Sequence, residues 1–153
     1  MVTVELKSLP VQRIAQVSAQ VAGPENIAPV IGPLYGSLAQ HLSTVGIEFG
    51  PFALATYEML DSGINISAAF PVSTDVVEGD GFDIVELPSI DLAATTVHHG
   101  SMATIGETWE SMMLWVSENG YEPVGISREV YLVSDPKPED EWVTEIQQPI
   151  VRA

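Results

Sequence analysis

Cysteine is absent from the 153-residue sequence. Its absence excludes a disulfide framework, a thiolate metal site and a cysteine nucleophile. Basic residues are scarce, with five Lys and Arg against 21 Asp and Glu, and the formal net charge is −16. Because nucleic acids and anionic lipids are bound by clustered Lys and Arg, we expect neither partner. The acidity itself leaves several explanations open: solubility, a basic protein partner, a salt-rich cytoplasm or a site that attracts cations.

Long apolar runs are also missing. No segment is apolar for long enough to span a membrane, and the first ten residues contain Glu5 and Lys7 and lack the apolar stretch of a signal peptide. We therefore expect a cytoplasmic protein with no membrane partner. Hydrophobic residues nevertheless make up 46% of the chain. That fraction is enough for a packed core in a domain of this length.

Several motifs of catalysis and cofactor binding are missing as well. There is no G-x-S-x-G nucleophile sequence. The stretch Gly79-Asp80-Gly81, which precedes a strand, has the wrong charge for a phosphate loop. His98 and His99 are neighbours on a predicted strand, so their side chains point to opposite faces, and no third metal ligand is evident. We expect no metal and no cofactor.

The sequence contains a weak internal repeat. The order of the matches along the chain predicts one domain made of two halves, about residues 1–76 and 77–153, although chance similarity between common residues is an alternative. The segments that recur at nearly constant spacing are Gly46-Ile47-Glu48 with Gly120-Tyr121-Glu122, Tyr57 with Tyr131, and Leu9-Pro10 with Leu87-Pro88.

Each half is predicted to contain a strand, a helix and two further strands, which gives an α+β fold. Two such units are expected to form one antiparallel sheet with both helices on one face and a ligand groove between the halves. Acidic segments at 75–81 and 135–141 are predicted to be a linker and a loop. Alternation and helical spacing predict strands at 11–21, 52–60, 64–70, 90–98, 125–132 and 142–146, and helices from about Pro33 to Leu42 and over 105–116, ended by Gly46 and Gly120.

The strand before residue 133 carries the main candidate site. With a period of two, Glu129 and Tyr131 share one face, and the apolar residues Ile126, Val130 and Leu132 share the other. If the apolar face packs under the helix, Glu129 and Tyr131 look into the groove. A carboxylate among aromatic rings suits a flat, cationic ligand and can also serve as a general base. The alternative is a solvated glutamate on an exposed sheet face.

Four further residues are candidates for binding a ligand. Tyr57 occupies the position of Tyr131 in the first half, so each half supplies one tyrosine to the predicted groove. Tyr35 and Trp109 lie on helical stripes, where core packing is the other possible role. Glu145 is expected to be a second carboxylate of the groove or a residue at its rim.

One longer pattern resembles a known family. Residues 120–132 read Gly-Tyr-Glu-Pro-x-Gly-x-x-Arg-Glu-x-Tyr-Leu, and Thr144-Glu145-Ile146-x-x-Pro149-Ile150 follows. This pattern is similar to the GyrI-like small-molecule-binding domains, also called the effector-binding domains of AraC-type and MerR-type multidrug regulators. The duplicated strand-helix-strand-strand plan is that family's fold, and the resemblance covers nearly the whole chain. The family often has Gly-Pro-Tyr where this chain has Gly100-Ser101-Met102.

The resemblance implies a pocket for hydrophobic compounds, often cationic or planar, with Glu129 as its central carboxylate. It implies a stand-alone member, without the DNA-binding segment of the regulators, used in sensing, sequestering or detoxifying foreign compounds. Two alternatives come from other members. One is a hydrolase that opens cyclopropane rings of DNA-alkylating natural products, with Glu129 as base and Tyr131 or Tyr57 as hydrogen-bond donor. The other is an acidic protein that binds and inhibits DNA gyrase. A regulator is a further possible protein partner. Whether the protein is a monomer or a homodimer stays open.

Overall fold

The computed structural model describes residues 2–49, 52–77, 79–134 and 137–153. Glu78 in the predicted linker, and Asp135 and Pro136 in the predicted loop, lie outside the described residues. The chain divides into two compact units. Unit 1 consists of Met1–Pro10 and Ser89–Ala153, and unit 2 consists of Val11–Pro88.

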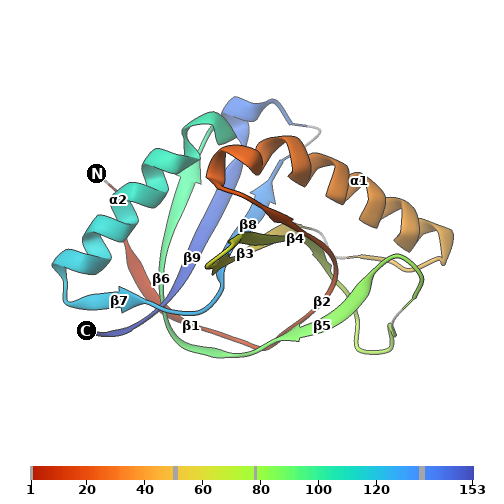
Figure 1. Ribbon diagram of the computed structural model, residues 1–153, viewed down its shortest axis with the longest axis horizontal. Helices are drawn as coiled ribbons and strands as arrows, with labels where there is room; N and C mark the ends of the chain where they lie inside the picture. Colours follow the sequence, from red (N-terminus) through yellow and green to blue (C-terminus); the bar gives the residue numbers. More distant parts are fainter. Residues whose placement is uncertain (1, 50–51, 78, 135–136) are drawn as a thin grey trace. The chain divides into compact units, whose positions relative to one another are not determined.

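Unit 2 is an antiparallel sheet with one α-helix packed on one of its faces (Figure 1). Its strands are hydrogen-bonded in the order β3-β4-β2-β5. The elements in chain order are β2 (Gln12–Val21), the short 3-10 helix η1 (Pro24–Asn26), α1 (Ala28–Thr44), β3 (Ala53–Leu60), β4 (Gly63–Pro71) and β5 (Asp83–Leu87).

Unit 1 repeats this plan. Its strands are paired in the order β1-β6-β9-β8, all antiparallel, and the short strand β7 pairs with one end of β9. The elements are β1 (Glu5–Leu9), β6 (Ile90–His99), the 3-10 helix η2 (Met102–Thr104), α2 (Ile105–Glu118), β7 (Tyr121–Pro123), β8 (Ser127–Val133), the 3-10 helix η3 (Glu139–Glu141) and β9 (Val143–Arg152).

The predicted strand-helix-strand-strand plan is confirmed in both units, as β2-α1-β3-β4 and as β6-α2-β8-β9. Each unit also has an edge strand that the repeat did not place. β1 precedes β2 in the chain but pairs with β6, and β5 precedes β6 but pairs with β2. The two edge strands end at equivalent residues, Leu9 and Leu87, which are both buried. The recurrence of Leu-Pro in the sequence therefore marks the end of an edge strand in each unit.

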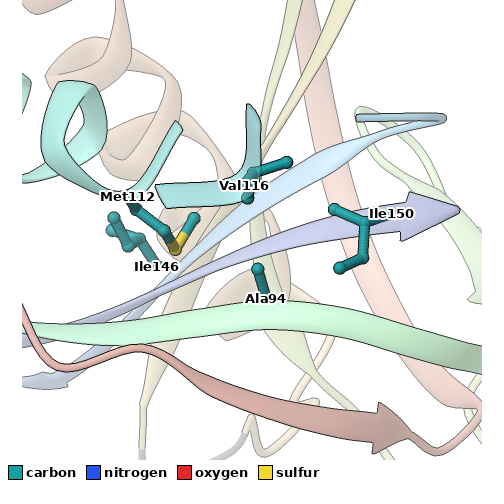
Figure 2. Close-up of a cluster of buried hydrophobic side chains, with 5 residues drawn as sticks. All are labelled: Ala94, Met112, Val116, Ile146 and Ile150. Atoms are coloured by element: carbon teal, nitrogen blue, oxygen red, sulfur yellow. The ribbon is translucent and has the colours of Figure 1, made fainter. Parts of the chain in front are cut away.

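The helix of each unit covers the face on which the sheet gathers its apolar residues. In unit 1 two apolar residues of α2 pack on residues of β6 and β9 (Figure 2). In unit 2 one cluster lies under the second half of α1, around Leu38 and Leu42, and another under its first half. The five buried residues of the unit 1 cluster are Ala94, Met112, Val116, Ile146 and Ile150.

The helix α1 is longer than predicted at its start. It begins at Ala28 rather than near Pro33, and Pro29 lies in its first turn. Proline is tolerated there because the first turn has no use for its missing N–H. Pro33 lies inside the helix, where it removes one backbone hydrogen bond without ending the element.

The ends of both helices agree with the prediction. Gly46 and Gly120 follow α1 and α2 with φ of 72° and 81°, a left-handed conformation that favours glycine. After α1 the N–H of Ile47 donates to the carbonyl of Leu42 at 2.9 Å, and Gly46 donates to Ser43 at 3.1 Å. This pair of bonds is a Schellman motif. No helix of the described residues is long and apolar enough to cross a lipid bilayer.

Candidate functional site

Glu129 is the carboxylate around which the candidate site of unit 1 is built. It lies in β8 and is only 5% exposed, so the alternative of a solvated glutamate is wrong. The Tyr131 hydroxyl donates a hydrogen bond to its Oε1 at 2.8 Å, and the Trp109 indole N–H donates to its Oε2 at 2.7 Å. Hydrogen bonds from two donors to a carboxylate are strong and fix its orientation.

The register of β8 shows which face of the sheet carries this carboxylate. Glu129 pairs with Ile146 of β9, and directly paired residues of antiparallel strands share a face. Ile146 packs against Met112 and Val116 of α2. Glu129 therefore lies on the face that α2 covers. The condition under which Glu129 and Tyr131 were expected to face the groove, with the apolar residues of β8 under the helix, does not hold.

The apolar residues of β8 lie on the face of the sheet opposite the helix. Val130 pairs with Glu145 on that face and is buried, but Leu132 is 49% exposed. Glu129 can be buried on the helix-facing side because Trp109 and Tyr131 donate hydrogen bonds to its carboxylate there. A period of two assigns residues to two faces, but it does not say which of the faces meets the helix.

Trp109 has both of the roles that its position on a helical stripe allowed. It is half-buried in α2, and its ring packs against the apolar cluster of unit 1. Its N–H at the same time contacts Glu129. The amphipathic indole joins the core to the carboxylate, as buried tryptophans commonly do by pairing their N–H.

Glu145 is not brought together with Glu129. It lies on the other face of the unit 1 sheet, where it accepts hydrogen bonds from Lys7 Nζ and Gln147 Nε2, each at 2.7 Å. The bond to Lys7 spans from β1 to β9 across β6. This arrangement is an ion pair that ties three strands together, and a ligand-binding role for Glu145 stays a prediction.

Tyr35 and Tyr57 both lie on the α1 side of unit 2. Tyr57 pairs with Ile66 of β4 and packs against the apolar cluster under the first half of α1. The Tyr35 hydroxyl, on α1, donates to the carbonyl of Leu54. Its ring meets Phe70 edge-on with 5.7 Å between ring centroids. Two aromatic residues of unit 2 are thus half-buried beside the helix, as Trp109 and Tyr131 are in unit 1.

The buried polar residues of unit 1 include Arg128 and His98, which were not predicted to be buried. Arg128 is 3% exposed, and desolvation lowers its pKa below the usual value. The signal was present in the sequence, because Arg128 stands among apolar residues of its strand face. His98 is also buried, and its ring nitrogens contact the Thr108 hydroxyl at 2.7 Å and the Ser101 carbonyl at 2.9 Å. These contacts fasten the turn before α2.

Neither a cluster of metal-ligating side chains nor the cavity described below lies at Glu129 among the described residues. Among the described residues, no three His, Asp or Glu side chains lie close enough together to hold a metal ion. A cavity of about 520 Å³ lies in unit 2 beyond the end of α1. None of the predicted site residues lines it. Its described walls include Val45, Ile47, Glu48, Asp75 and Phe82.

A helix-backed antiparallel sheet occurs twice in the chain and defines a duplicated α+β domain. Unit 1 carries a buried glutamate held by two aromatic donors. The sequence matches the GyrI-like small molecule binding domain over residues 3–151. The chain therefore belongs to the GyrI-like family, as its sequence pattern implied. No curated protein is significantly similar to it in sequence.

Solved structures share the fold. The C-terminal domain of EcmrR is 20% identical, with a TM-score of 0.79, and the match covers 100% of this chain and 99% of that one. In a complex of EcmrR with DNA the match is 21% identical with a TM-score of 0.79, and it covers 99% of this chain but 58% of that chain. SAV2435 bound to tetraphenylphosphonium is 14% identical with a TM-score of 0.69, covering 97% and 94%. The predicted α+β fold is confirmed.

Proposed function

We propose that this protein binds hydrophobic cations through Glu129, and that it thereby senses, sequesters or detoxifies foreign compounds. The observation that carries the proposal is the buried carboxylate of Glu129 held between Trp109 and Tyr131. Tyr35 and Tyr57, the aromatic residues beside α1, are proposed as further contacts of the ligand.

Burial makes a carboxylate selective for cations. Removing a charge from water is costly, and a cation that binds beside it recovers part of that cost. Aromatic rings add attraction for the same ligand, since their faces are electronegative. A flat or spherical hydrophobic cation satisfies both conditions. The fold of SAV2435, bound to tetraphenylphosphonium, supports this ligand class because it resembles the fold of this chain.

The proposal is tested by titrating the protein with tetraphenylphosphonium in a calorimeter. Glu129→Gln removes the charge but keeps the side-chain shape, and its amide can still accept from Trp109 and donate to the Tyr131 oxygen. We expect the variant to lose affinity by about ten- to a hundred-fold, the value of a charged contact in a desolvated site. Glu122→Gln, an exposed residue of β7, changes net charge equally and should bind like the wild type. Equal binding by the wild type and the Glu129 variant would contradict the proposal.

A second candidate function is hydrolysis of a cyclopropane-bearing alkylating compound. The observation in its favour is the 2.8 Å contact between the Tyr131 hydroxyl and Glu129. In the proposed step water bonds to one ring carbon, and the strained C–C bond breaks with its electron pair passing to the other carbon and the electron-withdrawing group attached to it. Glu129 accepts a proton from the water and returns it to that group, so that water is added across the broken bond. Product formation is followed by mass spectrometry. Product that forms at the same rate in Glu129→Gln would contradict the catalytic role.

Inhibition of DNA gyrase stays a third prediction, together with any regulator as partner. Retrieval of purified gyrase by the immobilised protein, unaffected by Glu129→Gln, would support it. Failure of pure gyrase to bind at micromolar concentrations would contradict it.

A further inference from the structure

The two oxygens of Glu129 each receive a hydrogen bond from a different element. Tyr131, two residues along the same strand, donates to Oε1, and Trp109 on α2 donates to Oε2. Both donors are half-buried, and the Trp109 ring is packed on the apolar cluster of unit 1. The carboxylate is therefore held on both sides by side chains that packing keeps in place.

This arrangement has a consequence for the kind of cation that fits. A protonated amine or an amidine binds a carboxylate through N–H bonds directed at the oxygen lone pairs. Each carboxylate oxygen has two lone pairs, and a protein donor takes one on each oxygen of Glu129. A ligand N–H must therefore reach a remaining lone pair between the packed rings or displace one of these donors. A buried donor left without a partner weakens binding. A quaternary or ring-delocalised cation carries no such donor and interacts through charge and ring faces alone.

We propose that Trp109 is a positioning residue that sets the cation selectivity of the site. By donating to Oε2 it makes Glu129 a partner for cations without N–H groups and a poor partner for cations that carry them. This inference rests on the proposed function and adds a determinant of specificity to it. Trp109 acts on the ligand through the Glu129 carboxylate, so the effect depends on its indole N–H and not only on the apolar packing of its ring.

Two dyes of the same ring system and charge test the selectivity. N-methylacridinium has no N–H donor, and aminoacridinium has a donor-bearing amino group. We expect the wild type to bind N-methylacridinium about ten-fold more tightly, the effect of one unpaired buried donor. Trp109→Phe keeps a ring but removes the N–H, and we expect the preference to shrink to within about two-fold.

Trp115→Phe is the matched control. Trp115 lies on the same helix, packs on the same apolar cluster and stacks on Tyr121 with 6.2 Å between centroids. The control should keep the wild-type preference even if it is less stable. A preference that is equal in the wild type and Trp109→Phe, or a wild type that favours aminoacridinium, would overturn the inference.

A spectroscopic signal separates positioning from plain structural support. The chain has three tryptophans, so the indole N–H region of a nitrogen-correlated NMR spectrum holds three signals. The Trp109 signal, assigned by its loss in Trp109→Phe, should move in Glu129→Gln and on saturation with N-methylacridinium. A Trp109 signal that ignores both changes would overturn the inference. If both dyes bind with dependence on Glu129 and only the selectivity is missing, the inference fails alone. If neither dye binds, or binding ignores Glu129→Gln, the proposed function fails with it.

Discussion

The indole nitrogen of Trp109 on α2 lies 2.7 Å from Oε2 of Glu129 on β8. This bond connects the helix of unit 1 to strand β8. Among the described contacts, Glu129 accepts a hydrogen bond from an aromatic side chain on each of its two oxygens. The hydrogen bond orients the carboxylate, and the rest of the tryptophan ring contributes to the core. Because Trp109 both orients the carboxylate proposed to bind the ligand and packs in the core, variants at this contact need controls for binding and for stability.

Tyr131→Phe should weaken tetraphenylphosphonium binding by about three- to ten-fold. The change removes the hydroxyl that donates to Oε1 of Glu129 at 2.8 Å. The loss of affinity is a part of the roughly 1.5–3 kcal/mol of such a bond, because the carboxylate keeps its charge and only its orientation is weakened. Tyr121→Phe is the control, because the Tyr121 ring stacks on Trp115 and lies 5.5 Å from the Arg152 guanidinium. Calorimetry of both variants checks the prediction. A larger loss in Tyr121→Phe than in Tyr131→Phe would speak against it.

The Lys7–Glu145 ion pair should stabilise the fold, and variants of the pair also test the ligand role predicted for Glu145. A double-mutant cycle with Lys7→Met and Glu145→Gln should give a coupling of about 0.5 kcal/mol in urea unfolding. The value is small because the Lys7 side chain is 37% exposed and water screens the pair. A tetraphenylphosphonium affinity in Glu145→Gln that stays within about two-fold of the wild type would contradict the ligand role. A loss of affinity as large as that of Glu129→Gln would instead place Glu145 in the binding site.

Two glycines associated with α1 should respond to alanine in opposite directions. Gly46 has φ of 72° and nothing within 4 Å of the position of an added Cβ, so Gly46→Ala should cost about 1 kcal/mol from backbone strain alone. Gly36 lies inside the helix with equal space around it. Gly36→Ala should stabilise the protein by about 0.5–1 kcal/mol, since alanine favours helix. Urea unfolding of both variants measures the difference, and shifts of the same sign would refute the assignment of the helix end.

The carboxyl of Asp75 should titrate below its ordinary range. A hydrogen bond from the Ser73 hydroxyl and one from its own backbone N–H lower its pKa from 3.8. A group whose pKa is lowered in the folded state adds stability above its unfolded pKa, and that stability is lost as the pH falls through the folded value. Carbon NMR titration should show the Asp75 pKa rising in Ser73→Ala. An unchanged pKa would exclude the hydroxyl as the cause.

The sequence predicted the repeated plan because each repeat ends its helix with a glycine that the backbone requires. Gly46 and Gly120 are held to this residue type by positive φ, so they survive as markers where other positions diverge. The edge strands β1 and β5 were harder to place, because the alternation of apolar and polar residues in a strand does not show which strand it pairs with. β1 directly precedes β2 of unit 2 in the chain but pairs with β6 of unit 1. β5 directly precedes β6 of unit 1 but pairs with β2 of unit 2.

The sequence predicted that Glu129 and Tyr131 lie together, but not which face of the sheet they share. The period of two correctly placed Glu129 beside Tyr131, and it noted the charged Arg128 among apolar neighbours. It could not show that the helix covers the face of Glu129, since that depends on the register of β8 with β9. The donation from Trp109 was also invisible, because it joins residues whose contact arises from helix packing.

Glu129 is proposed to give the protein its selectivity for positive charge. This role is tested most directly by measuring tetraphenylphosphonium and neutral triphenylphosphine oxide against the wild type and Glu129→Gln. We expect the wild type to prefer the cation by about ten-fold or more, and Glu129→Gln to lose this preference while binding of the neutral compound stays unchanged. A preference for the cation that persists in Glu129→Gln would contradict this role.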